Sequence, residues 1–474
     1  MKTYTATIGL EIHAELATAT KMFCNSKNDP DEKRPNVNIC PVCMGHPGTL
    51  PVINKQAVKN VLKVGLALGG DLADFTEFDR KNYFYPDIPK GYQISQYKYP
   101  LVSGGSLKGF KITRVHLEED TGTSQHETGD YSLVNYNRAG VPLMELVTEP
   151  VIHSGEEAVA FAKELQLLLR YLGVAEANME KGEMRVEANI SISDDPTKFG
   201  TKVEVKNLNS FRTVEKAINY EIARHQEVLE SGGTIVQETR GWNEAKQSTY
   251  SQRQKEDSHD YRYFPDPDLP KLKISEIPEF AKAELQKELG ELPWDKRTRY
   301  QKEFELRDDD IEVYITQPEW GVYFESLIKH LNADKKLIKL ASNYISSDLL
   351  GMVRKEPEFW AQKPIAENDF AELIKMVGEN KVNSRVAKDL LALMYKEGGS
   401  PMAIAEKNDL LQKNDEGALK AIMQKLVDDN PKVVADYKAG KEAALMFFVG
   451  QGMKATKGSA NPELLKGVVK GIIG

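Results

Sequence analysis

The feature that most constrains the fold of this chain is a strict alternation of apolar and polar side chains, which recurs in residues 3–16, 184–193 and 201–211. A period of two is typical of a β-strand with one buried face. In the first segment Ile8, Leu10 and Ile12 alternate with Glu11, His13 and Glu15. We therefore expect a sheet with one apolar face. Its other face is either simply solvated, or it holds carboxylate and imidazole groups within reach of one shared ion.

A second constraint is the run of acids that closes ITRVHLEEDTG, residues 112–122. Consecutive carboxylates at a strand end repel one another, so they need a metal ion, basic side chains or open solvent around them. Strict alternation points Glu118 and Glu119 to opposite faces, and both serve one site only if the strand breaks or bulges there. Glu145 stands in an otherwise apolar strand segment, where a carboxylate needs a partner, so it is a candidate metal ligand or base.

The polar strand positions share a composition that indicates phosphate chemistry. Carboxylates combined with His13 suit Mg²⁺ or Mn²⁺ better than zinc, and the nearby Arg185 and Lys206 suit phosphate groups. Together they predict metal-assisted phosphoryl transfer. The sequence carries no Walker A, dinucleotide-binding or kinase motif, so an ATP site would be of another kind.

Residues 21–51 form a loop that carries all three cysteines, Cys24, Cys40 and Cys43. A CPVC turn with an upstream cysteine has the spacing of a zinc site, but the fourth ligand is missing unless His46 supplies it. An odd number of cysteines in a long chain also fits reduced thiols without a metal. Zinc and free thiols are therefore alternatives here.

Residues 78–96 combine five aromatic side chains with three basic ones and show little periodicity. Tyr83 and its aromatic neighbours beside Lys81 suit a platform for a base or nucleotide, and a loop packed over a core is the alternative. Residues 251–270 are rich in proline, aromatic and acidic side chains, and we interpret them as a packed lid or boundary.

Length and composition place the chain among globular proteins with more than one domain. It has 474 residues and a net charge of −8, so a nucleic-acid partner must be held by a local basic surface. The N-terminal residues lack an apolar signal segment, and the sequence has no long uncharged apolar run, which predicts a cytoplasmic location.

Helices are expected in two settings. Ser154 and Glu157 form a capping box at the start of an apolar stripe, which predicts a helix over 154–173 that backs the sheet. From about Pro293 the pattern becomes helical, and GGSP at 398–401 indicates a linker. Near the C-terminus Lys454 and Lys457 stand in a glycine-rich loop, either as contacts to a phosphate backbone or as a solvated tail.

Seven stretches of this sequence, in order, resemble the motifs of the B subunit of aspartyl/glutamyl-tRNA(Asn/Gln) amidotransferases. They are IGLEIHAEL, FDRKNYFYPDIPKGYQISQ, RVHLEEDTG, LVNYNRAGVPLMELVTEP, RVEANIS, KVEVKNLNSF and DYRYFPDPDLP. The resemblance covers the whole chain and is far more specific than any single pattern above.

The resemblance implies an α+β protein: a strand-rich antiparallel cradle domain over 1–292, a helical domain over 293–400 and a small helical tail domain over 401–474 that binds tRNA. The family's B subunit uses ATP and Mg²⁺ to phosphorylate the side-chain carboxylate of Glu-tRNA(Gln) or Asp-tRNA(Asn), and ammonia then displaces the phosphate. The implied enzyme is an ATP-dependent, glutamine-hydrolysing ligase. Its amidase A subunit supplies ammonia, and a small C subunit completes a heterotrimer.

The resemblance also implies roles for single residues. We expect His13, Glu119 and Glu145 to hold Mg²⁺, with Glu11, Glu118 and Glu187 around a second cation or the phosphates of ATP. The remaining expected site residues are Lys81 and Lys206 for the transferring group, and Arg185, Asn189 and Tyr83 for the cofactor.

One departure from the family concerns the cysteine loop. Many members carry four cysteines there, whereas Ser26 stands at the expected fourth position, which puts structural zinc in doubt. The alternative to a catalytic subunit is a tRNA-binding scaffold that keeps the fold without the chemistry. The presence of Glu11, His13, Glu119 and Glu145 favours catalysis.

Overall fold

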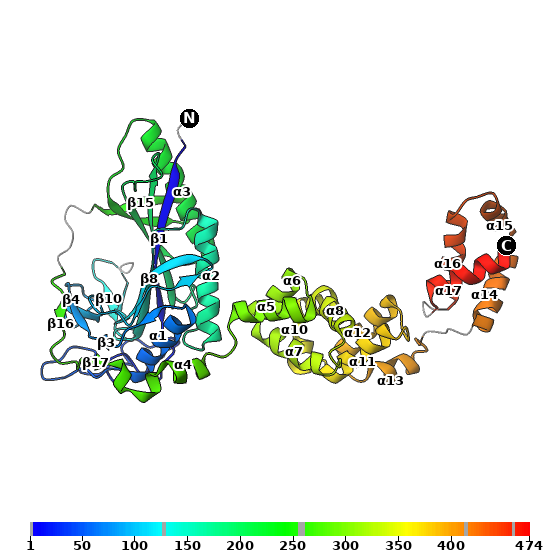
Figure 1. Cartoon of the computed structure of the whole chain (residues 1–474), viewed down its shortest axis with the longest axis horizontal. Coiled ribbons are helices and arrows are strands. Elements are labelled where there is room, and N and C mark those ends of the chain that lie inside the picture. The colour runs from blue at the N-terminus through cyan, green and yellow to red at the C-terminus, as the bar shows by residue number, and fades with distance from the viewer. Residues whose placement is uncertain (1–2, 126–128, 255–260, 412–415, 457–459) are drawn as a thin grey trace. The chain divides into compact units, whose positions relative to one another are not determined.

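The computed structural model describes residues 3–125, 129–254, 261–411, 416–456 and 460–474. The chain divides into two compact units, Met1–Pro293 and Trp294–Gly474 (Figure 1). The described strands all lie in the first unit, and the second is built from helices. The predicted α+β class, with a strand-rich N-terminal part followed by a helical part, is confirmed.

A ten-stranded sheet organises the first unit. Its strand order is β15-β14-β13-β12-β1-β11-β8-β6-β2, and β7 pairs with β8 off this path. The neighbours are antiparallel except for β13 and β14, which are parallel. The strands are β1 (Thr5–Glu15), β2 (Asp71–Leu72), β6 (Val102–Ser103), β7 (Ser106–Leu107), β8 (Phe110–Glu119), β11 (Pro142–Thr148), β12 (Met184–Ser193), β13 (Val203–Leu208), β14 (Glu238–Asn243) and β15 (Ser248–Gln254).

The alternation in β1 has the structural consequence expected from the sequence. Ile8, Leu10 and Ile12 are buried, and α2 (Gly155–Tyr171) and α3 (Phe211–Glu230) pack along this side of the sheet (Figure 1). The Ser154 side chain accepts a hydrogen bond from the Glu157 backbone N–H, as the capping box predicts. Because two helices cover one face, the opposite face is left for the polar side chains.

Three small sheets and several helices complete this unit. They are β16 (Phe264–Pro265) with β4 (Asp79–Asn82) and β5 (Tyr92–Ser95), β9 (Thr123–Gln125) with β10 (Leu133–Asn135), β3 (Phe75–Thr76) with β17 (Leu272–Lys273), α1 (Lys55–Ala67), η1 (Ile274–Glu276), η2 (Pro278–Phe280) and α4 (Lys282–Glu288). The strand β5 packs against β8. The sheet of β4, β5 and β16 therefore lies beside the strand that carries the acidic run.

The second unit consists of helices with buried apolar stripes. They are α5 (Pro293–Phe304), α6 (Asp308–Thr316), α7 (Pro318–Lys329), α8 (Lys335–Tyr344), η3 (Ile345–Leu349), α9 (Leu350–Lys355), α10 (Pro357–Gln362), α11 (Glu367–Gly378), α12 (Ser384–Glu397), α13 (Pro401–Lys407), α14 (Glu416–Asp428), α15 (Pro431–Lys438), α16 (Ala443–Ala455) and α17 (Pro462–Ile473). The helix α13 packs against α11 and α12. The helices α14, α16 and α17 enclose a separate core with Met423, Phe448 and Leu465.

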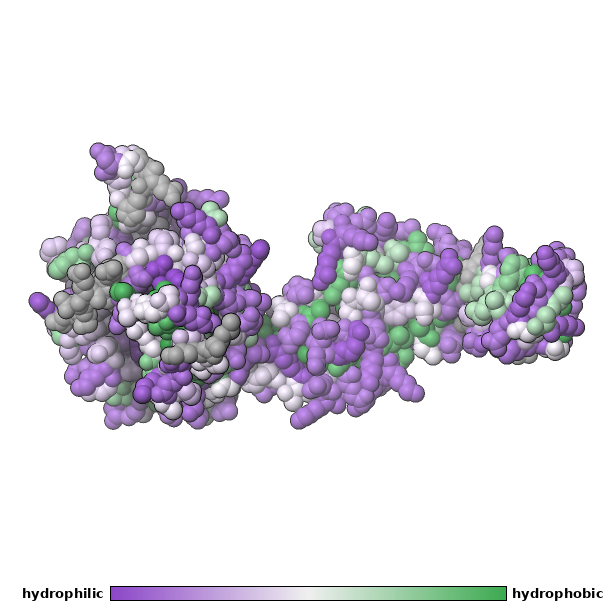
Figure 2. Space-filling model, turned by 90° about the horizontal axis from the view of Figure 1, so that it is seen from above, coloured by the Kyte–Doolittle hydropathy of each residue, from purple (hydrophilic) through white to green (hydrophobic). Residues whose placement is uncertain are grey.

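The surface of both units is mostly hydrophilic on the face that Figure 2 shows, with small hydrophobic areas between the polar side chains. Within the described part of the chain, no helix combines the length and the apolar character needed to cross a membrane.

Candidate functional site

Four neighbouring strands place one polar row across the open face of the large sheet. His13 in β1 pairs directly with Arg185 in β12 on one side and with Glu145 in β11 on the other. Glu145 in turn pairs with His116 in β8. Directly paired residues of neighbouring strands point to the same face. Segments that lie far apart in the sequence therefore meet in a single row.

The acidic and imidazole groups of this face converge on His13. Its Nε2 lies 3.4 Å from Glu145 Oε2, 3.5 Å from Glu118 Oε1 and 3.9 Å from Glu11 Oε1. The His116 Nε2 lies 3.4 Å from the same Glu145 oxygen. The groups Glu11–His13–Glu145 and His116–Glu118–Glu145 each offer three ligand atoms within 4.8 Å of one another. Carboxylate oxygens with imidazole nitrogens form a donor set that fits Mg²⁺ or Mn²⁺.

The electrostatics of this cluster fit a cation. Burial lowers the pKa of His13, but Glu145 and Glu118 outweigh burial and raise it to about 9. Burial and the charge of Glu145 raise the pKa of Glu118 to about 7. Burial lowers the pKa of His116 to about 4, so this imidazole is neutral at pH 7 and able to act as a ligand. His13 therefore carries a proton at pH 7 and Glu118 is partly protonated, and a bound cation would replace these protons.

The next row towards the N-terminus of β1 joins Glu11 to Glu187 in β12. Lys206 in β13 binds Glu187, with 2.7 Å between Nζ and Oε2, and also lies 3.7 Å from a Glu204 oxygen. Burial lowers the pKa of Lys206, but Glu187 and Glu204 outweigh burial and raise it well above its usual range. Lys206 is therefore a fixed cation beside Glu11, as a phosphate-binding lysine requires.

A second ion cluster lies beyond His13, and the sequence did not predict that its members meet. Asp120 is buried between two guanidinium groups, with 3.1 Å to Arg185 Nη2 and 3.1 Å to Arg138 Nε. Arg138 also lies 3.8 Å from Glu15. Burial and the nearby Asp120 raise the pKa of Glu15 to about 8. Arg185, which we expected at the cofactor, is thus held by Asp120.

Residues 78–96 and 261–268 form an aromatic wall beside the acidic cluster. The Lys81 ammonium lies 5.0 Å from the ring centre of Tyr261 and 5.7 Å from that of Tyr83. Burial, followed by the charge of Glu118, raises the pKa of Tyr83 well above its usual range. Arg80 connects the two segments through an ion pair with Asp266, with 2.7 Å between Nε and Oδ2. Lys81 and Tyr83 therefore border the site, and Tyr261 is a neighbour that the sequence did not single out.

The structure corrects the expected position of Glu119. The pairing of β8 with β11 is regular through Glu118 and Glu119, and its only described irregularity lies between Val147 and Thr148. Glu119 therefore points to the face opposite Glu118. There it accepts hydrogen bonds from Lys90 Nζ and from the Ile94 N–H. The carboxylate beside His13 and Glu145 is that of Glu118, because no bulge turns its neighbour to the same side.

The third residue expected at the cofactor, Asn189, lies apart from Tyr83 and Arg185. It pairs with Gly9 of β1, one row beyond Glu11 and Glu187. It lines a cavity to which neither Tyr83 nor Arg185 contributes. The structure therefore does not bring the three residues into one subsite.

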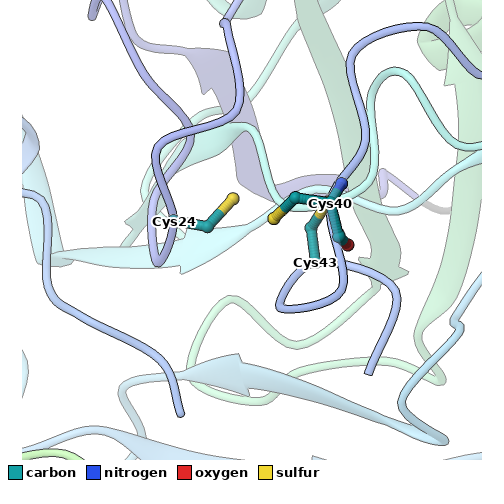
Figure 3. Close-up of side chains that lie close together, drawn as sticks. All are labelled: Cys24, Cys40 and Cys43. Carbon is teal, nitrogen blue, oxygen red and sulfur yellow. The ribbon is translucent and has the colours of Figure 1, made fainter. Parts of the chain in front are cut away.

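The three cysteines come together, with Cys24 pointing from its loop towards Cys40 and Cys43 of the CPVC turn (Figure 3). Their sulfur atoms lie within 4.8 Å of one another, and His46 is not part of the group. The Ser26 hydroxyl lies 3.8 Å from Cys43 Sγ. The contact with Cys24 lowers the pKa of Cys43 to about 4, against burial and together with the Lys21 ammonium, 3.8 Å away. The described residues thus offer zinc three thiol ligands and a hydroxyl in place of the fourth.

Of the two lysines expected to bind tRNA, only Lys454 lies in the described part of the chain. Lys454 lies in the last turn of α16 and is exposed, so it belongs to a helix rather than to a glycine-rich loop. The expectation of a loop overlooked that Gly450 and Gly452 lie inside α16, where a Cβ on Gly452 would meet Met423 Sδ at 2.6 Å. Lys457 lies outside the described residues.

Several members of the site were missed in the sequence although a signal for them existed. His116 alternates with Arg114 and Glu118 in β8, and Arg114 lies 3.4 Å from Glu145. Period-two reasoning applied backwards from Glu118 would have placed both on the polar face. Glu15 lies on the polar face that the alternation in residues 3–16 predicts. Arg138 gave no comparable signal, because only the fold brings a turn residue beside a strand end.

The strand-rich unit and the helical unit each match a known family of protein domains. The family described as GatB/GatE catalytic domain matches residues 6–278, and the family described as GatB domain matches residues 322–473.

Curated relatives match over nearly the whole length. The chain is 45% identical to the B subunit of the aspartyl/glutamyl-tRNA(Asn/Gln) amidotransferase of Caldanaerobacter subterraneus subsp. tengcongensis, with 97% of each chain covered. It is 43% identical to the B subunit of Persephonella marina, with 98% of each covered, and 44% identical to that of Thermotoga neapolitana, with 99% of each covered. The chain therefore belongs to the family of aspartyl/glutamyl-tRNA(Asn/Gln) amidotransferase B subunits.

Proposed function

We propose that this chain is the carboxylate-activating subunit of a tRNA-dependent amidotransferase. It binds Glu-tRNA(Gln), Asp-tRNA(Asn) or both, transfers a phosphoryl group from ATP to the side-chain carboxylate, and lets ammonia displace the phosphate. The observation that carries the proposal is the convergence of Glu118, Glu145 and Glu11 on His13. The names of the relatives supply the substrate class, tRNA charged with aspartate or glutamate.

A divalent cation fits the proposed site. A donor set that includes Glu145 would hold Mg²⁺, formed either with Glu11 and His13 or with His116 and Glu118, because the donor atoms of each combination lie within 4.8 Å of one another. When bound, the ion would neutralise phosphate charge and polarise the group being transferred. This set replaces the one expected from the sequence, since Glu119 faces away.

The chain's own basic residues would position the phosphates. Lys206 forms an ion pair with Glu187 beside Glu11. Lys81 lies in the aromatic wall, and its charge opposes the rise in the pKa of Glu118 that burial and Glu145 cause. Fixed cations on both sides of the acids would stabilise the charge that develops during phosphoryl transfer. The half-buried tyrosine rings, Tyr83 among them, would help to keep water from the activated carboxylate.

The ammonia must come from elsewhere in a complex. A side-chain carboxylate reacts with ammonia only after one oxygen becomes a leaving group, which is the step proposed for this chain. We assign glutamine hydrolysis to an amidase A subunit and the joining of the two to a small C subunit, in a heterotrimer in the cytoplasm. The chain would thus be one part of a glutamine-hydrolysing ligase.

The parts of the chain would divide the work as follows. Residues 1–292 form the catalytic cradle for ATP, Mg²⁺ and the aminoacyl end of tRNA. Residues 293–400 form the helical domain. Residues 401–474 form the tail that holds tRNA, with Lys454 exposed on α16.

The test is Glu145→Ala in the reconstituted complex. Because Glu145 touches both His13 and His116, its loss should lower the rate of Gln-tRNA or Asn-tRNA formation by about 100-fold or more. Binding of tRNA and hydrolysis of glutamine should persist. The rate is measured by amino-acid analysis of the deacylated tRNA.

Two further variants make this result specific. Glu145→Gln keeps the side-chain shape and removes the charge, so it should behave like Glu145→Ala. Glu279→Gln alters an exposed carboxylate paired with Lys55 and should leave the rate unchanged. Unchanged amidation in both Glu145 variants would favour the alternative, a tRNA-binding scaffold without its own chemistry.

A further inference from the structure

The three cysteines play no part in the proposed function, although the fold brings them together from separate segments. Cys24 stands in the loop that follows β1, and its side chain points towards Cys40 and Cys43 of the CPVC turn (Figure 3). The three sulfur atoms lie within 4.8 Å of one another. Thiols that meet in this way are either ligands of a metal or partners in a disulfide.

The group is incomplete as a zinc site. A structural zinc ion takes four ligands, almost always thiolates and imidazoles. The position nearest to a fourth ligand is held by the Ser26 hydroxyl, 3.8 Å from Cys43 Sγ, and His46 is not part of the group. A neutral hydroxyl is a poor substitute for a thiolate, so the sulfur atoms stay available for other chemistry.

Hydrogen-bond donors converge on one of the sulfur atoms, Cys43 Sγ. The Cys40 N–H lies 3.2 Å from it and the Lys21 ammonium 3.8 Å. Lys21 is completely buried, and its other contact is the Tyr136 carbonyl oxygen at 3.2 Å. Among the residues that the structure describes, no carboxylate lies within ion-pair distance of Lys21. These donors hold the Cys43 sulfur in place and stabilise negative charge on it.

A cavity of about 200 Å³ gives access to two of the three cysteines. Its lining includes Cys24 and Cys43 but not Cys40, together with the Lys90 and Glu119 pair on the same side of β8. A water molecule takes up about 30 Å³ in the liquid. Hydrogen peroxide is only slightly larger, so the cavity has room for it beside both sulfur atoms.

We propose that Cys24 and Cys43 form a redox-active pair, which a peroxide converts to a disulfide. Cys43 Sγ attacks one oxygen of hydrogen peroxide, the O–O bond breaks, and the sulfur becomes a sulfenic acid while the first water leaves. The Cys24 thiol then attacks that sulfur, and the hydroxyl leaves with the thiol proton as the second water. Two thiols thus give two electrons to one peroxide. The inference does not depend on the proposed function.

The disulfide would change what the site binds. It takes two of the three sulfur ligands, so the oxidised chain cannot hold zinc there. It would also join the loop after β1 to the CPVC turn, at the edge of the cavity that contains Lys90 and Glu119. In reducing compartments, disulfides that form and open again in this way serve as redox sensors.

The experiment maps the thiols of the reconstituted complex. The reduced, zinc-free complex is treated with a small excess of hydrogen peroxide, free thiols are alkylated, and tryptic peptides are analysed by mass spectrometry. Trypsin places Cys24 in residues 22–27 and leaves Cys40 and Cys43 together on a peptide that ends at Lys55. The expected disulfide is therefore a cross-link between two peptides, which fragmentation assigns to Cys43 and dithiothreitol reverses.

Matched samples make the result specific. Cys40→Ser should keep the cross-link, whereas Cys24→Ser and Cys43→Ser should each lose it. The wild-type chain unfolded in urea should give every pairing of the three cysteines, because the arrangement of the sulfur atoms is then lost. In the folded complex a single pairing should account for at least nine-tenths of the disulfide.

Three outcomes would overturn the proposed pair. They are thiols that remain reduced, a disulfide of Cys40 with either of the others, and oxidation of Cys43 to a sulfinic acid while Cys24 stays reduced. The decisive map is that of the wild type, so it does not depend on whether a variant folds. Because the readout is a covalent bond and not a rate of amidation, the outcome is independent of the proposed function.

Discussion

Glu118 and Glu119 are neighbours in the chain, yet they serve different surroundings. Glu118 faces His13 with a pKa raised to about 7, whereas Glu119 is paired with Lys90 on the other side of β8. Both are nearly inaccessible to solvent. The regular pleat of the strand alone separates a candidate metal ligand from a buried ion pair.

This separation predicts opposite effects of two matched substitutions. Glu118→Gln should lower the affinity for Mn²⁺ by about tenfold or more, because it removes a charged donor beside His13. Glu119→Gln should leave Mn²⁺ binding intact but cost about 3 kcal/mol of unfolding free energy, because Lys90 loses its partner in a buried site. Electron paramagnetic resonance titration and urea unfolding measure the two quantities. Equal loss of Mn²⁺ affinity in both variants would contradict the geometry.

The cysteine group allows a second prediction at this scale. Two ligands 2.3 Å from a tetrahedral zinc ion are about 3.8 Å apart, which matches the 3.8 Å between Ser26 Oγ and Cys43 Sγ. Ser26→Cys should therefore complete a four-thiolate site and raise the zinc content of the purified protein to one per chain. The wild type, with three thiolates, should hold less. Mass spectrometry of the metal content checks this, with Ser26→Ala as the control.

At the scale of elements, β1 is the strand on which the site depends. It lies between β11 and β12, contributes Glu11 and His13 to the acidic cluster, and turns its apolar side to the helices. A buried network of ion pairs and hydrogen bonds connects α3 to β14 and β15 at one end of the same sheet. Glu221 of α3 contacts Arg224, Arg240 and Thr249 and lies 3.2 Å from His225 Nε2.

This network predicts how stability depends on pH. Burial raises the pKa of Glu221, but His225, Arg224 and Thr249 outweigh burial and lower it to about 2, from 4.5. A lowered carboxyl pKa stabilises the fold above pH 4.5, and that stabilisation is lost as pH falls from 4.5 towards 2. The difference corresponds to about 3 kcal/mol.

Glu221→Gln should therefore destabilise the protein at pH 7 and flatten the acid dependence of its unfolding free energy. Urea unfolding at a series of pH values between 7 and 3 measures both effects. Glu230→Gln, which alters a carboxylate in the last turn of α3, serves as the control. An acid dependence as steep as in the wild type would show that other carboxylates carry it.

At the scale of the whole molecule, the tail helices form a core of their own. Leu419, Met423, Phe448 and Leu465 are buried among α14, α16 and α17. The preceding helix α13 packs with α11 and α12 instead. Truncation after Leu411 therefore keeps α13 packed against α11 and α12, whereas truncation at the expected boundary, 400/401, would remove α13 from them.

Removal of residues 412–474 should weaken tRNA binding while ATP binding to the cradle persists. We expect about a tenfold loss of tRNA affinity at moderate salt, because basic side chains such as Lys454 leave with the tail. Filter binding and calorimetry measure the two affinities in the complex. The tRNA affinity of Lys454→Glu in the full chain, compared with that of Lys396→Glu on α12, shows whether the charge of Lys454 itself contributes to binding. Unaltered tRNA affinity after truncation would contradict the proposed role of the tail in tRNA binding.

The sequence alone determined the elements that depend on local periodicity. The strands around Ile8 and Ile190, the helix capped by Ser154, and the change to helices near Pro293 all follow from spacing within a few residues. The polar faces with Glu11, His13 and Glu187 follow from the same rule, and Glu145 stands out as a single carboxylate in an apolar strand. These are properties of each segment by itself.

Only the tertiary structure decided which polar groups meet. Register across β12, β1, β11 and β8 places His13 beside Glu145 and His116, and the regular pairing at the end of β8 sends Glu119 away from them. The pairing of β1 with β11 and β12 joins residues more than a hundred positions apart, and no local pattern encodes such a register. The same holds for the Asp120, Arg138 and Glu15 cluster and for the cavity at Asn189, because each exists only where distant segments pack together.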